Sequence, residues 1–461
     1  MTPSGPNLVL VVLDTARADL VGAGHDTAFA QLGRRGRRFH RAVAPAPWTL
    51  PSHASILSGL RPSEHGVTGA AVMTPAGPRS PRSRIEALPS WLPETLRGNG
   101  LATFCASGNP WMGRATGLAH GFETVFEAWR SAPLPKLADP LAPGGGSAGM
   151  ARKAAVYARR AVGLGDGGAA ASLSVFRSFL DGRGDRSFFA FFNVMEPHAP
   201  YAPPRGHGGR RSVAALRAVR RWNAERMLRF CTGREEIADG ELALLRSQYR
   251  AEISYTDAWL GRLLETLDAQ RILDDTVVAV TADHGENLGE HHRLSHVLSM
   301  HETLLHVPLA IAGPAVETGE ERAPVGLTAL PATLLAALDG RWRDPAVGIP
   351  VAEYESAAAQ VSGARRLDEQ VPPELREELR ARWVVAYEGS LKYSASSDGR
   401  ECLVDLDADP TEARDVSAAH PDAVRRLREV RGAWAGAAET GDSDAGLDAE
   451  IAAHLEGLGY L

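Results

Sequence analysis

Apolar runs alternate with helical periodicities over the first two thirds of the chain. Continuous apolar runs occupy residues 7–13 (NLVLVVL), 101–107 (LATFCAS) and 187–195 (SFFAFFNVM). Their β-branched and aromatic residues are typical of buried strands. Helical spacing follows at residues 27–39, and residues 244–270 form a long amphipathic pattern. Strands that alternate with helices in this way predict an α/β fold with a mainly parallel sheet.

The pattern changes near residue 345. Before that point, residues 274–292 predict a buried strand that ends in an acidic and histidine-rich loop. After it, residues 382–410 alternate between apolar and polar positions and carry turn signals, which predicts a small antiparallel sheet. We therefore expect a catalytic domain at 1–345 and a C-terminal subdomain at 346–461, the latter with terminal helices.

Two segments depart from this regularity. Residues 131–150 are rich in proline and glycine, which predicts a mobile loop or lid, with a domain boundary as the competing interpretation. Residues 210–230 are strongly basic and predict a surface helix. A nucleic-acid patch is the alternative for this helix, but the neighbouring segments are not basic. Both segments are candidates to cover a site and set its specificity.

Composition and charge narrow the class of protein. The 461 residues are 44% hydrophobic and 23% charged, with a formal net charge of −6. These values are ordinary for a globular protein and give no reason to expect nucleic acid or a membrane as a partner. The three cysteines, Cys105, Cys231 and Cys402, are scattered and predict no disulfide framework. No apolar run is long enough to span a bilayer, so we expect a cytoplasmic protein.

Acidic and histidine side chains follow two of the predicted strands. Asp14 ends the first strand, and Asp283 and His284 end the strand near residue 281. In open α/β sheets the carboxyl ends of strands form the ligand site. Two carboxylates and an imidazole can hold a divalent cation, and a nearby hydroxyl, such as that of Thr49, would then be activated as a nucleophile.

The chain also resembles the sulfatase family of the alkaline phosphatase superfamily. The segments that carry the resemblance occur in the family's order and are NLVLVVLDTARADLVG, APWTLPSHASILSGLRPSEHGV, MEPHAPY, AEISYTDAWLGRLLETL, TVVAVTADHGENLGEHH, HETLLHVPLAI and CLVDLDADPTEARDVS. The resemblance implies an alkaline phosphatase-like α/β fold. This is a large mixed, mainly parallel sheet sandwiched by helices, with a small C-terminal antiparallel sheet.

The same resemblance assigns roles to individual residues. It implies that Asp14, Asp283 and His284 bind the metal, and that Thr49 is both the nucleophile and a further ligand. His198, in EPHAPY, matches a histidine that contacts the ester or protonates the leaving group.

Further residues match positions near the substrate. Asn109 and His296 fall near positions of anion contacts, and His53 replaces an arginine of the family motif. We predict all three as substrate-binding residues. His291 and His301, with the adjacent His292, are candidates for structural or supporting roles.

Two departures from the family pattern affect the expected chemistry. Sulfatases carry cysteine or serine at the nucleophile position, which a maturation enzyme oxidises to formylglycine, whereas this chain has Thr49 followed by Pro51 and His53. We therefore expect no formylglycine. In the family a second acidic ligand usually follows the first, but Thr15 follows Asp14 here.

An unmodified threonine restricts the reaction. It cannot expel sulfate by collapse to an aldehyde, so its covalent intermediate must be displaced by water or another acceptor. Superfamily members with a threonine nucleophile are mostly of the phosphate type, including lipoteichoic acid synthases, phosphoethanolamine transferases and nucleotide pyrophosphatase/phosphodiesterases. The first two imply one ion, and we expect one divalent ion, manganese or calcium first, with zinc or magnesium as alternatives.

The sequence therefore supports a leading hypothesis and three alternatives. The first is a metal-dependent hydrolase of a small phosphomonoester, phosphodiester or phosphonate ester that acts through Thr49. The second is a soluble transferase that passes the phosphoryl group to an alcohol. The third is a sulfatase or sulfotransferase without formylglycine. A non-catalytic relative that only binds metal or anions is the fourth, but the retained Asp14, Thr49, His198, Asp283 and His284 argue against it. The oligomeric state is left open.

Overall fold

The computed structural model describes residues 5–69, 72–74, 77–79, 82–130, 166–209, 224–356 and 379–432. The predicted loop at 131–150 and the predicted helix at 447–461 lie outside these residues. Of the predicted basic helix at 210–230, the described part begins at α9 (Ala224–Cys231).

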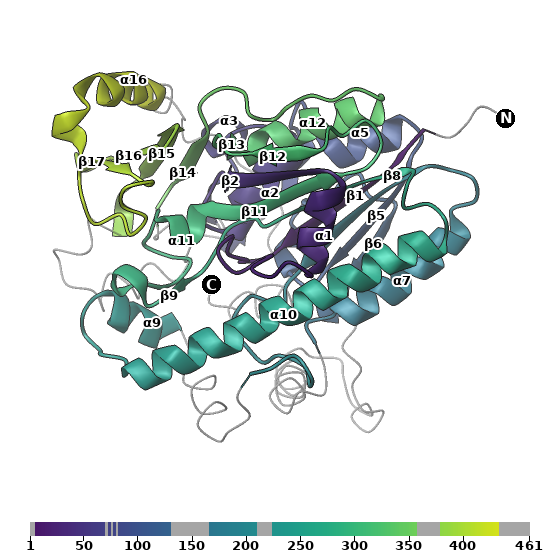
Figure 1. Ribbon diagram of the computed structural model, residues 1–461, viewed down its shortest axis with the longest axis horizontal. Helices are drawn as coiled ribbons and strands as arrows, with labels where there is room; N and C mark the ends of the chain where they lie inside the picture. Colours follow the sequence, from purple (N-terminus) through teal and green to yellow (C-terminus); the bar gives the residue numbers. More distant parts are fainter. Residues whose placement is uncertain are drawn as a thin grey trace.

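A mixed sheet of nine strands forms the centre of the molecule (Figure 1). Its order is β12 (Gly319–Glu321), β2 (Arg37–Val43), β11 (His306–Ala312), β8 (Thr276–Thr281), β1 (Asn7–Leu13), β7 (Phe188–Val194), β5 (Ala102–Ser107) and β6 (Thr124–Glu127), with β13 (Val325–Gly326) also pairing with β2. Strands β8, β1, β7, β5 and β6 run parallel, whereas β11 is antiparallel to both β8 and β2.

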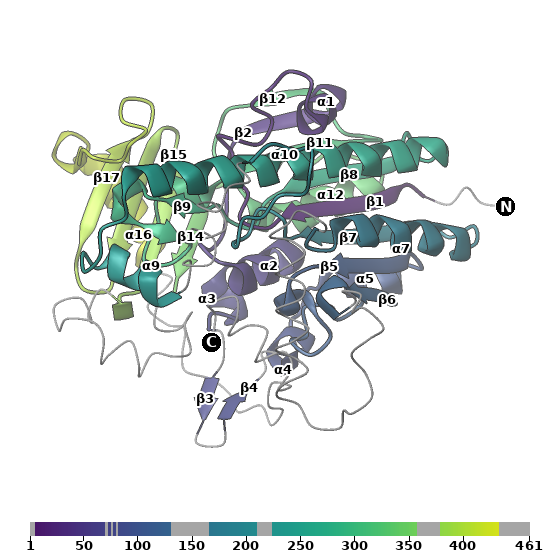
Figure 2. The same cartoon turned by 90° about the horizontal axis from the view of Figure 1, so that it is seen from below.

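Helices cover both faces of this sheet (Figures 1 and 2). One layer contains α1 (Ala28–Arg35), α7 (Ala169–Gly182) and α10 (Asp239–Ala269), and the other contains α2 (Thr49–Ser58), α5 (Leu92–Gly98) and α12 (Leu330–Leu338). The remaining helices and hairpins are α3 (Pro62–His65), α4 (Arg82–Glu86), α11 (Glu302–Leu305), η1 (Pro110–Met112), η2 (Ala128–Arg130), η3 (Glu290–His292), η4 (Leu327–Ala329), η5 (Ser417–Ala419), β3 (Val72–Thr74) with β4 (Gly77–Arg79), and β9 (Asn287–Leu288) with β10 (Leu294–Ser295).

Strand β7 shows why the strands of the central sheet are apolar at almost every position of their sequence. Because side chains alternate between the faces of a sheet, Phe192 packs against Trp259 of α10, whereas Phe191 packs against His53 of α2. Both layers therefore need apolar partners from the same strand. The predicted α/β architecture is confirmed by this arrangement.

The segment 27–39, predicted as one helix, is instead divided between α1 and β2. The division falls at Gly36, where a Cβ atom would lie 2.1 Å from the carbonyl oxygen of Ile311 in β11. Only glycine allows the chain to turn so close to the neighbouring strand. Tertiary packing, rather than helical spacing, decides where α1 ends.

The C-terminal part forms a separate antiparallel sheet, as predicted. Its order is β14 (Val351–Tyr354), β15 (Trp383–Glu388), β16 (Leu391–Ser396) and β17 (Glu401–Asp405), and α16 (Pro421–Gly432) packs on it. Tyr354 and Val385 belong to the same apolar cluster as the central sheet, whereas Tyr393 and Leu427 belong to a second one. The C-terminal sheet therefore shares a core with the central sheet, and the domain boundary at 345/346 stays a prediction.

A buried lysine joins the C-terminal sheet to the rest of the molecule. Lys392 of β16 is 1% exposed, and its ammonium donates to the carbonyl of Met300 at 2.8 Å and to Glu412 at 2.6 Å. It also lies 3.0 Å from Glu302. Burial opposes the charge, but the two carboxylates outweigh it and raise the pKa of Lys392. The ion cluster therefore ties β16 to the loop that precedes α11.

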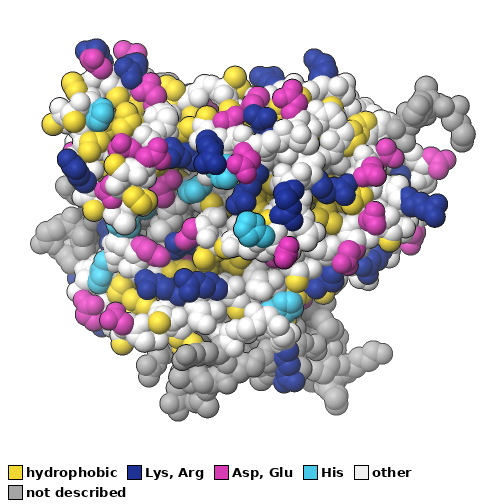
Figure 3. Space-filling model, viewed as in Figure 1, with side chains coloured by type: hydrophobic (Ala, Val, Ile, Leu, Met, Phe, Trp, Pro, Cys, Tyr) yellow, Lys and Arg dark blue, Asp and Glu magenta, His cyan; other side chains and the backbone are white. Residues whose placement is uncertain are grey.

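The surface seen in Figure 3 carries side chains of both signs, intermixed over α10 and the C-terminal sheet. This mixture agrees with the small net charge. Within the described ranges, no helix has both the length and the apolar character needed to cross a membrane.

We predict that Lys392→Met lowers the melting temperature, because it leaves the carboxylates of Glu302 and Glu412 buried without their cation. The expected loss is about 3 kcal/mol. Arg341→Ala, which removes an exposed ion pair with Asp339, is the control and should change stability by less than about 1 kcal/mol. Equal melting temperatures for both variants would contradict a structural role for the buried cluster.

Candidate active site

Two carboxylates and one imidazole meet at the carboxyl edge of the central sheet. Asp14, Asp283 and His284 are each fully buried, and one ligand atom from each lies within 4.8 Å of the others. The sheet register produces this meeting, because Val12 of β1 pairs with Thr281 of β8 and both strands end immediately afterwards. The sequence prediction placed these three side chains together, and the geometry agrees.

The two carboxylates have oxygen atoms that the protein does not satisfy. Asp14 Oδ1 and Asp283 Oδ2 are buried and have no hydrogen-bond partner among the described residues. Burial, followed by the nearby charge of Asp14, holds the pKa of Asp283 well above its usual range. Two buried carboxylates in contact are unfavourable without a cation, so these oxygen atoms fit a divalent metal ion.

His284 is oriented to present one nitrogen to this centre. Its Nδ1 donates to the carbonyl of Gly285 at 2.9 Å, and its Nε2 lies 3.4 Å from Asp283 Oδ2. Burial, and then the neighbouring His296, hold the pKa of His284 well below its usual range. The imidazole is therefore neutral, and its Nε2 lone pair faces the carboxylates as a metal ligand requires.

Gly285 allows this turn after the Asp283–His284 pair. A Cβ atom at Gly285 would lie 2.0 Å from the carbonyl oxygen of Thr303, which no side chain tolerates. Ser52 of α2 donates to the carbonyl of Asp283 at 2.6 Å and fixes the pair from the other side. The pair is thus held by backbone contacts that leave its side chains directed to the centre.

Thr49 lies beside these residues at the first position of α2. Its Oγ1 atom is 3.4 Å from His284 Nε2, and the whole side chain is buried. A helix N-terminus carries partial positive charge, because its first N–H groups have no partners within the helix. The hydroxyl of Thr49 therefore lies where an anion and an anionic nucleophile are both stabilised.

Thr15 has an unusual backbone conformation next to Asp14. Its φ is +61°, which is strained for a β-branched residue. Two hydrogen bonds stabilise this backbone conformation. The N–H of Thr15 donates to Asp283 Oδ1 at 3.2 Å, and its carbonyl accepts from the hydroxyl of Tyr249 at 2.7 Å. Its Oγ1 is buried and without a hydrogen-bond partner among the described residues. The backbone of Thr15, rather than a second carboxylate, thus contacts the centre.

His53 is one helical turn beyond Thr49 and is fully buried. Its Nδ1 donates to the carbonyl of Thr49 at 2.9 Å, and its Nε2 lies 3.3 Å from the amide nitrogen of Asn193. Burial lowers the pKa of His53, so the ring is neutral. Both ring nitrogens already have protein partners, which favours support of the Thr49 turn. Substrate contact by His53 stays a prediction.

Asn109 also contacts the protein rather than open space. Its amide nitrogen donates to Asp14 Oδ2 at 2.8 Å, and its Oδ1 accepts from the N–H of Trp111 at 3.0 Å. The predicted role of Asn109 in anion binding stays a prediction. Its hydrogen bond to Asp14 instead indicates that Asn109 orients the carboxylate of Asp14.

Asn193 was not identified from the sequence. Its amide nitrogen donates to the same Asp14 oxygen at 3.1 Å, and its Oδ1 accepts from the hydroxyl of Ser107 at 3.0 Å. The available signal was that Asn193 is the single polar residue in the apolar strand β7 (FFAFFNV). A polar side chain in such a strand, near its carboxyl end, indicates a role in the site.

Two further histidines line up beside His284. The His296 ring centroid lies 4.6 Å from that of His284 and 5.2 Å from that of His198. Burial lowers the pKa of His198, whose Nδ1 donates to the carbonyl of Ala199 at 2.7 Å. These predicted residues therefore lie in the same buried centre as the metal-binding candidates.

Glu286 is a second residue that sequence analysis missed. It is fully buried, lies 3.3 Å from His296 Nδ1, and accepts from the hydroxyl of Tyr201 at 2.9 Å. It thus links the EPHAPY segment to the loop after β8. The sequence gives only a weak indication of this role, because Glu286 is one acidic residue among several in the loop after β8.

The remaining loop histidines pack elsewhere. The rings of His291 and His301 stack at 3.8 Å, and His292 stacks on Phe230 at 4.1 Å. Burial lowers the pKa of His301 to about 3. Of the structural and supporting roles considered for these three histidines, the contacts favour the structural one.

Solved structures of other proteins share the fold of this chain. It resembles a phosphonate monoester hydrolase of Agrobacterium radiobacter over 93% of this chain and 94% of that one, with a TM-score of 0.60 and 19% identity. It resembles a phosphonate monoester hydrolase from Silicibacter pomeroyi over the same shares, with a TM-score of 0.64 and 19% identity. A putative sulfatase from Bacteroides thetaiotaomicron matches over 97% and 96%, at a TM-score of 0.61 and 15% identity. The chain thus shares the fold class of these phosphonate monoester hydrolases and of this putative sulfatase.

Within that class, the chain belongs to the sulfatase family, whose model matches residues 6–340. Curated relatives include a choline-sulfatase of Rhizobium meliloti (strain 1021), 32% identical over 182 residues, which are 40% of this chain and 35% of that protein. Arylsulfatase K of Bos taurus is 29% identical over 213 residues, 43% of this chain and 37% of that protein. The matched parts thus span little more than a third of these relatives. The predicted family membership is confirmed.

We predict that Asp283→Asn abolishes the rise in melting temperature that manganese or calcium produces in chelator-treated protein, because the variant lacks one anionic ligand. Metal content should fall in parallel when measured by elemental analysis. Asp339→Asn, at an exposed position, serves as the control. Retention of wild-type metal content by Asp283→Asn would exclude this centre as the metal site.

Proposed function

We propose that the protein is a metal-dependent hydrolase of a small phosphate-type ester that acts through a covalent Thr49 intermediate. The observation that carries the proposal is the 3.4 Å separation between Thr49 Oγ1 and His284 Nε2, beside the unsatisfied oxygen atoms of Asp14 and Asp283. A nucleophile and a cation-binding site thus meet at one helix N-terminus.

The proposed metal site consists of Asp14, Asp283 and His284, with the Thr49 hydroxyl as a further ligand. When bound, one divalent ion would supply positive charge beside the reacting ester and lower the pKa of the hydroxyl. Oxygen-rich ligands favour manganese or calcium, and the single imidazole also permits zinc or magnesium. Asn109 and Asn193 hold Asp14 in position for this role.

The protein's own groups then divide the reaction into two displacements. Thr49 Oγ, after losing its proton to solvent, forms a bond to phosphorus as the bond to the leaving oxygen breaks. His198 first takes up a proton from solvent, because burial lowers its pKa and leaves the ring neutral, and this imidazolium then donates the proton to the leaving oxygen. In the second step water attacks phosphorus, the bond to Thr49 Oγ breaks, and the threonine hydroxyl recovers a proton.

The choice of phosphorus over sulfur rests on the nucleophile. An unmodified threonine lacks the aldehyde route by which formylglycine releases sulfate, whereas a phosphothreonine can be cleaved by in-line attack. The relatives carry sulfatase names and the structures of similar fold include phosphonate monoester hydrolases. Both chemistries therefore occur within this fold, and the threonine decides our preference.

We predict that Thr49→Ala reduces kcat/KM on aryl phosphate, aryl phosphodiester and aryl phosphonate esters to the uncatalysed level, since no covalent intermediate can form. Thr49→Ser is the matched control and should retain measurable turnover. An aryl sulfate belongs in the same panel. A clear preference for the sulfate, or full activity of Thr49→Ala, would refute the proposed intermediate.

We also predict that His198→Asn lowers kcat/KM by about 100-fold for esters with a poor leaving group, because general-acid assistance is lost. Esters of nitrophenol need little protonation and should lose much less. His292→Asn, which alters a histidine outside the centre, is the control. The same loss for both kinds of ester would assign His198 a role other than proton donation.

A further inference from the structure

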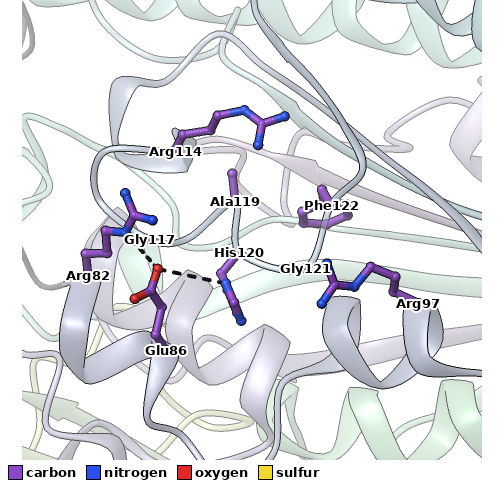
Figure 4. Close-up of a pocket in the computed structure, with 9 residues that line it drawn as sticks. All are labelled: Arg82, Glu86, Arg97, Arg114, Gly117, Ala119, His120, Gly121 and Phe122. Atoms are coloured by element: carbon purple, nitrogen blue, oxygen red, sulfur yellow. Dashed lines mark hydrogen bonds and ion pairs between the residues drawn. The ribbon is translucent and has the colours of Figure 1, made fainter.

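A second concave site lies away from the proposed catalytic centre. A cavity of about 220 Å³ opens between α4, α5 and the loop 113–122 (Figure 4). Of these elements, α5 lies beside β5 in Figure 2. Its lining contains none of the residues assigned to metal binding, nucleophilic attack or proton transfer. The lining residues are Arg82, Glu86, Arg97, Arg114, Gly117, Ala119, His120, Gly121 and Phe122.

Glycines shape the loop that forms one wall of this cavity. Gly117 and Gly121 have φ values of +90° and +84°. A Cβ atom would lie 2.7 Å from Arg82 Cα at the first and 2.5 Å from the backbone nitrogen of Glu94 at the second. The loop therefore folds directly against α4 and α5, and this close packing brings basic side chains from three segments to one hollow.

Positive charge dominates the lining. The lining contains three guanidinium groups and one carboxylate, that of Glu86. Figure 4 shows Arg97, Arg114 and His120 around the same hollow, with Glu86 turned towards Arg82 and His120. Guanidinium forks match the oxygen atoms of phosphate and sulfate and bind them through charge-assisted hydrogen bonds.

The two carboxylates nearby neutralise only part of this charge. Arg82 pairs with Glu86 at 2.7 Å, and Arg97 pairs with Glu94 at 2.9 Å. Glu94 also contacts the Nε2 atom of His120, so this imidazole is occupied. Arg114 has no carboxylate within ion-pair distance in the described part of the chain. Its guanidinium has a single long contact, 3.4 Å, to the carbonyl of Glu123. One guanidinium is therefore available to an incoming anion.

We propose that this pocket binds a phosphate or sulfate group, either as the free ion or as the end of a small ester, through Arg114, with Arg97 beside it. The cavity is larger than one tetrahedral oxyanion needs but smaller than the ~300–1,000 Å³ of sites for drug-sized ligands. The ligand is thus a compact oxyanion with at most a small substituent. The inference goes beyond the proposed function, because it does not depend on Thr49 chemistry.

Selenate provides a direct test of position. Crystals of the full chain soaked in selenate should show an anomalous peak beside Arg114 and Arg97. A peak confined to the catalytic centre would overturn the proposal.

Calorimetry on chelator-treated protein tests the residues. Arg114→Ala should weaken binding of inorganic phosphate and sulfate by about tenfold. Arg425→Ala, which removes an exposed arginine outside the pocket, is the control and should leave binding unchanged. Comparison of inorganic phosphate with glycerol phosphate distinguishes a free ion from an ester. Equal affinities of wild type and Arg114→Ala for all of these probes would refute the pocket as an anion site.

Discussion

The proximity of two buried carboxylates, Asp14 and Asp283, is the constraint on which the rest of the centre depends. Each has an oxygen atom without a hydrogen-bond partner among the described residues, and burial next to Asp14 raises the pKa of Asp283. Such a pair is unfavourable in a protein interior unless a cation joins it. The parallel pairing of β1 with β8 places both residues there, so the central sheet itself creates the demand for a metal ion.

The groups around this pair orient it and supply the chemistry. Asn109 and Asn193 share one oxygen of Asp14, while the backbone of strained Thr15 holds Asp283. The other components are Thr49 at the helix N-terminus and the neutral ring of His284. Under the proposed mechanism, selectivity between phosphorus and sulfur esters would follow from how a threonine intermediate is resolved rather than from charge alone.

Sequence reasoning reached the fold and the central residues because both have strong local signals. Apolar runs ended at Asp14 and at Asp283, and strand ends meet in α/β sheets. It failed where packing overrides local pattern, as at Gly36, whose contact with β11 ends a helix early. It also missed Asn193 and Glu286, because their roles arise from contacts between segments far apart in the sequence. No motif reveals such contacts.

The most direct test of the account is to identify the covalent intermediate. Wild-type protein restored with manganese is mixed with an aryl phosphonate or phosphate ester, quenched in acid during turnover, digested and examined by high-resolution mass spectrometry. The account predicts a phosphorus-containing adduct on the peptide that carries Thr49, absent from Thr49→Ala. Turnover with an unmodified Thr49, or with a modified residue elsewhere in the centre, would contradict it.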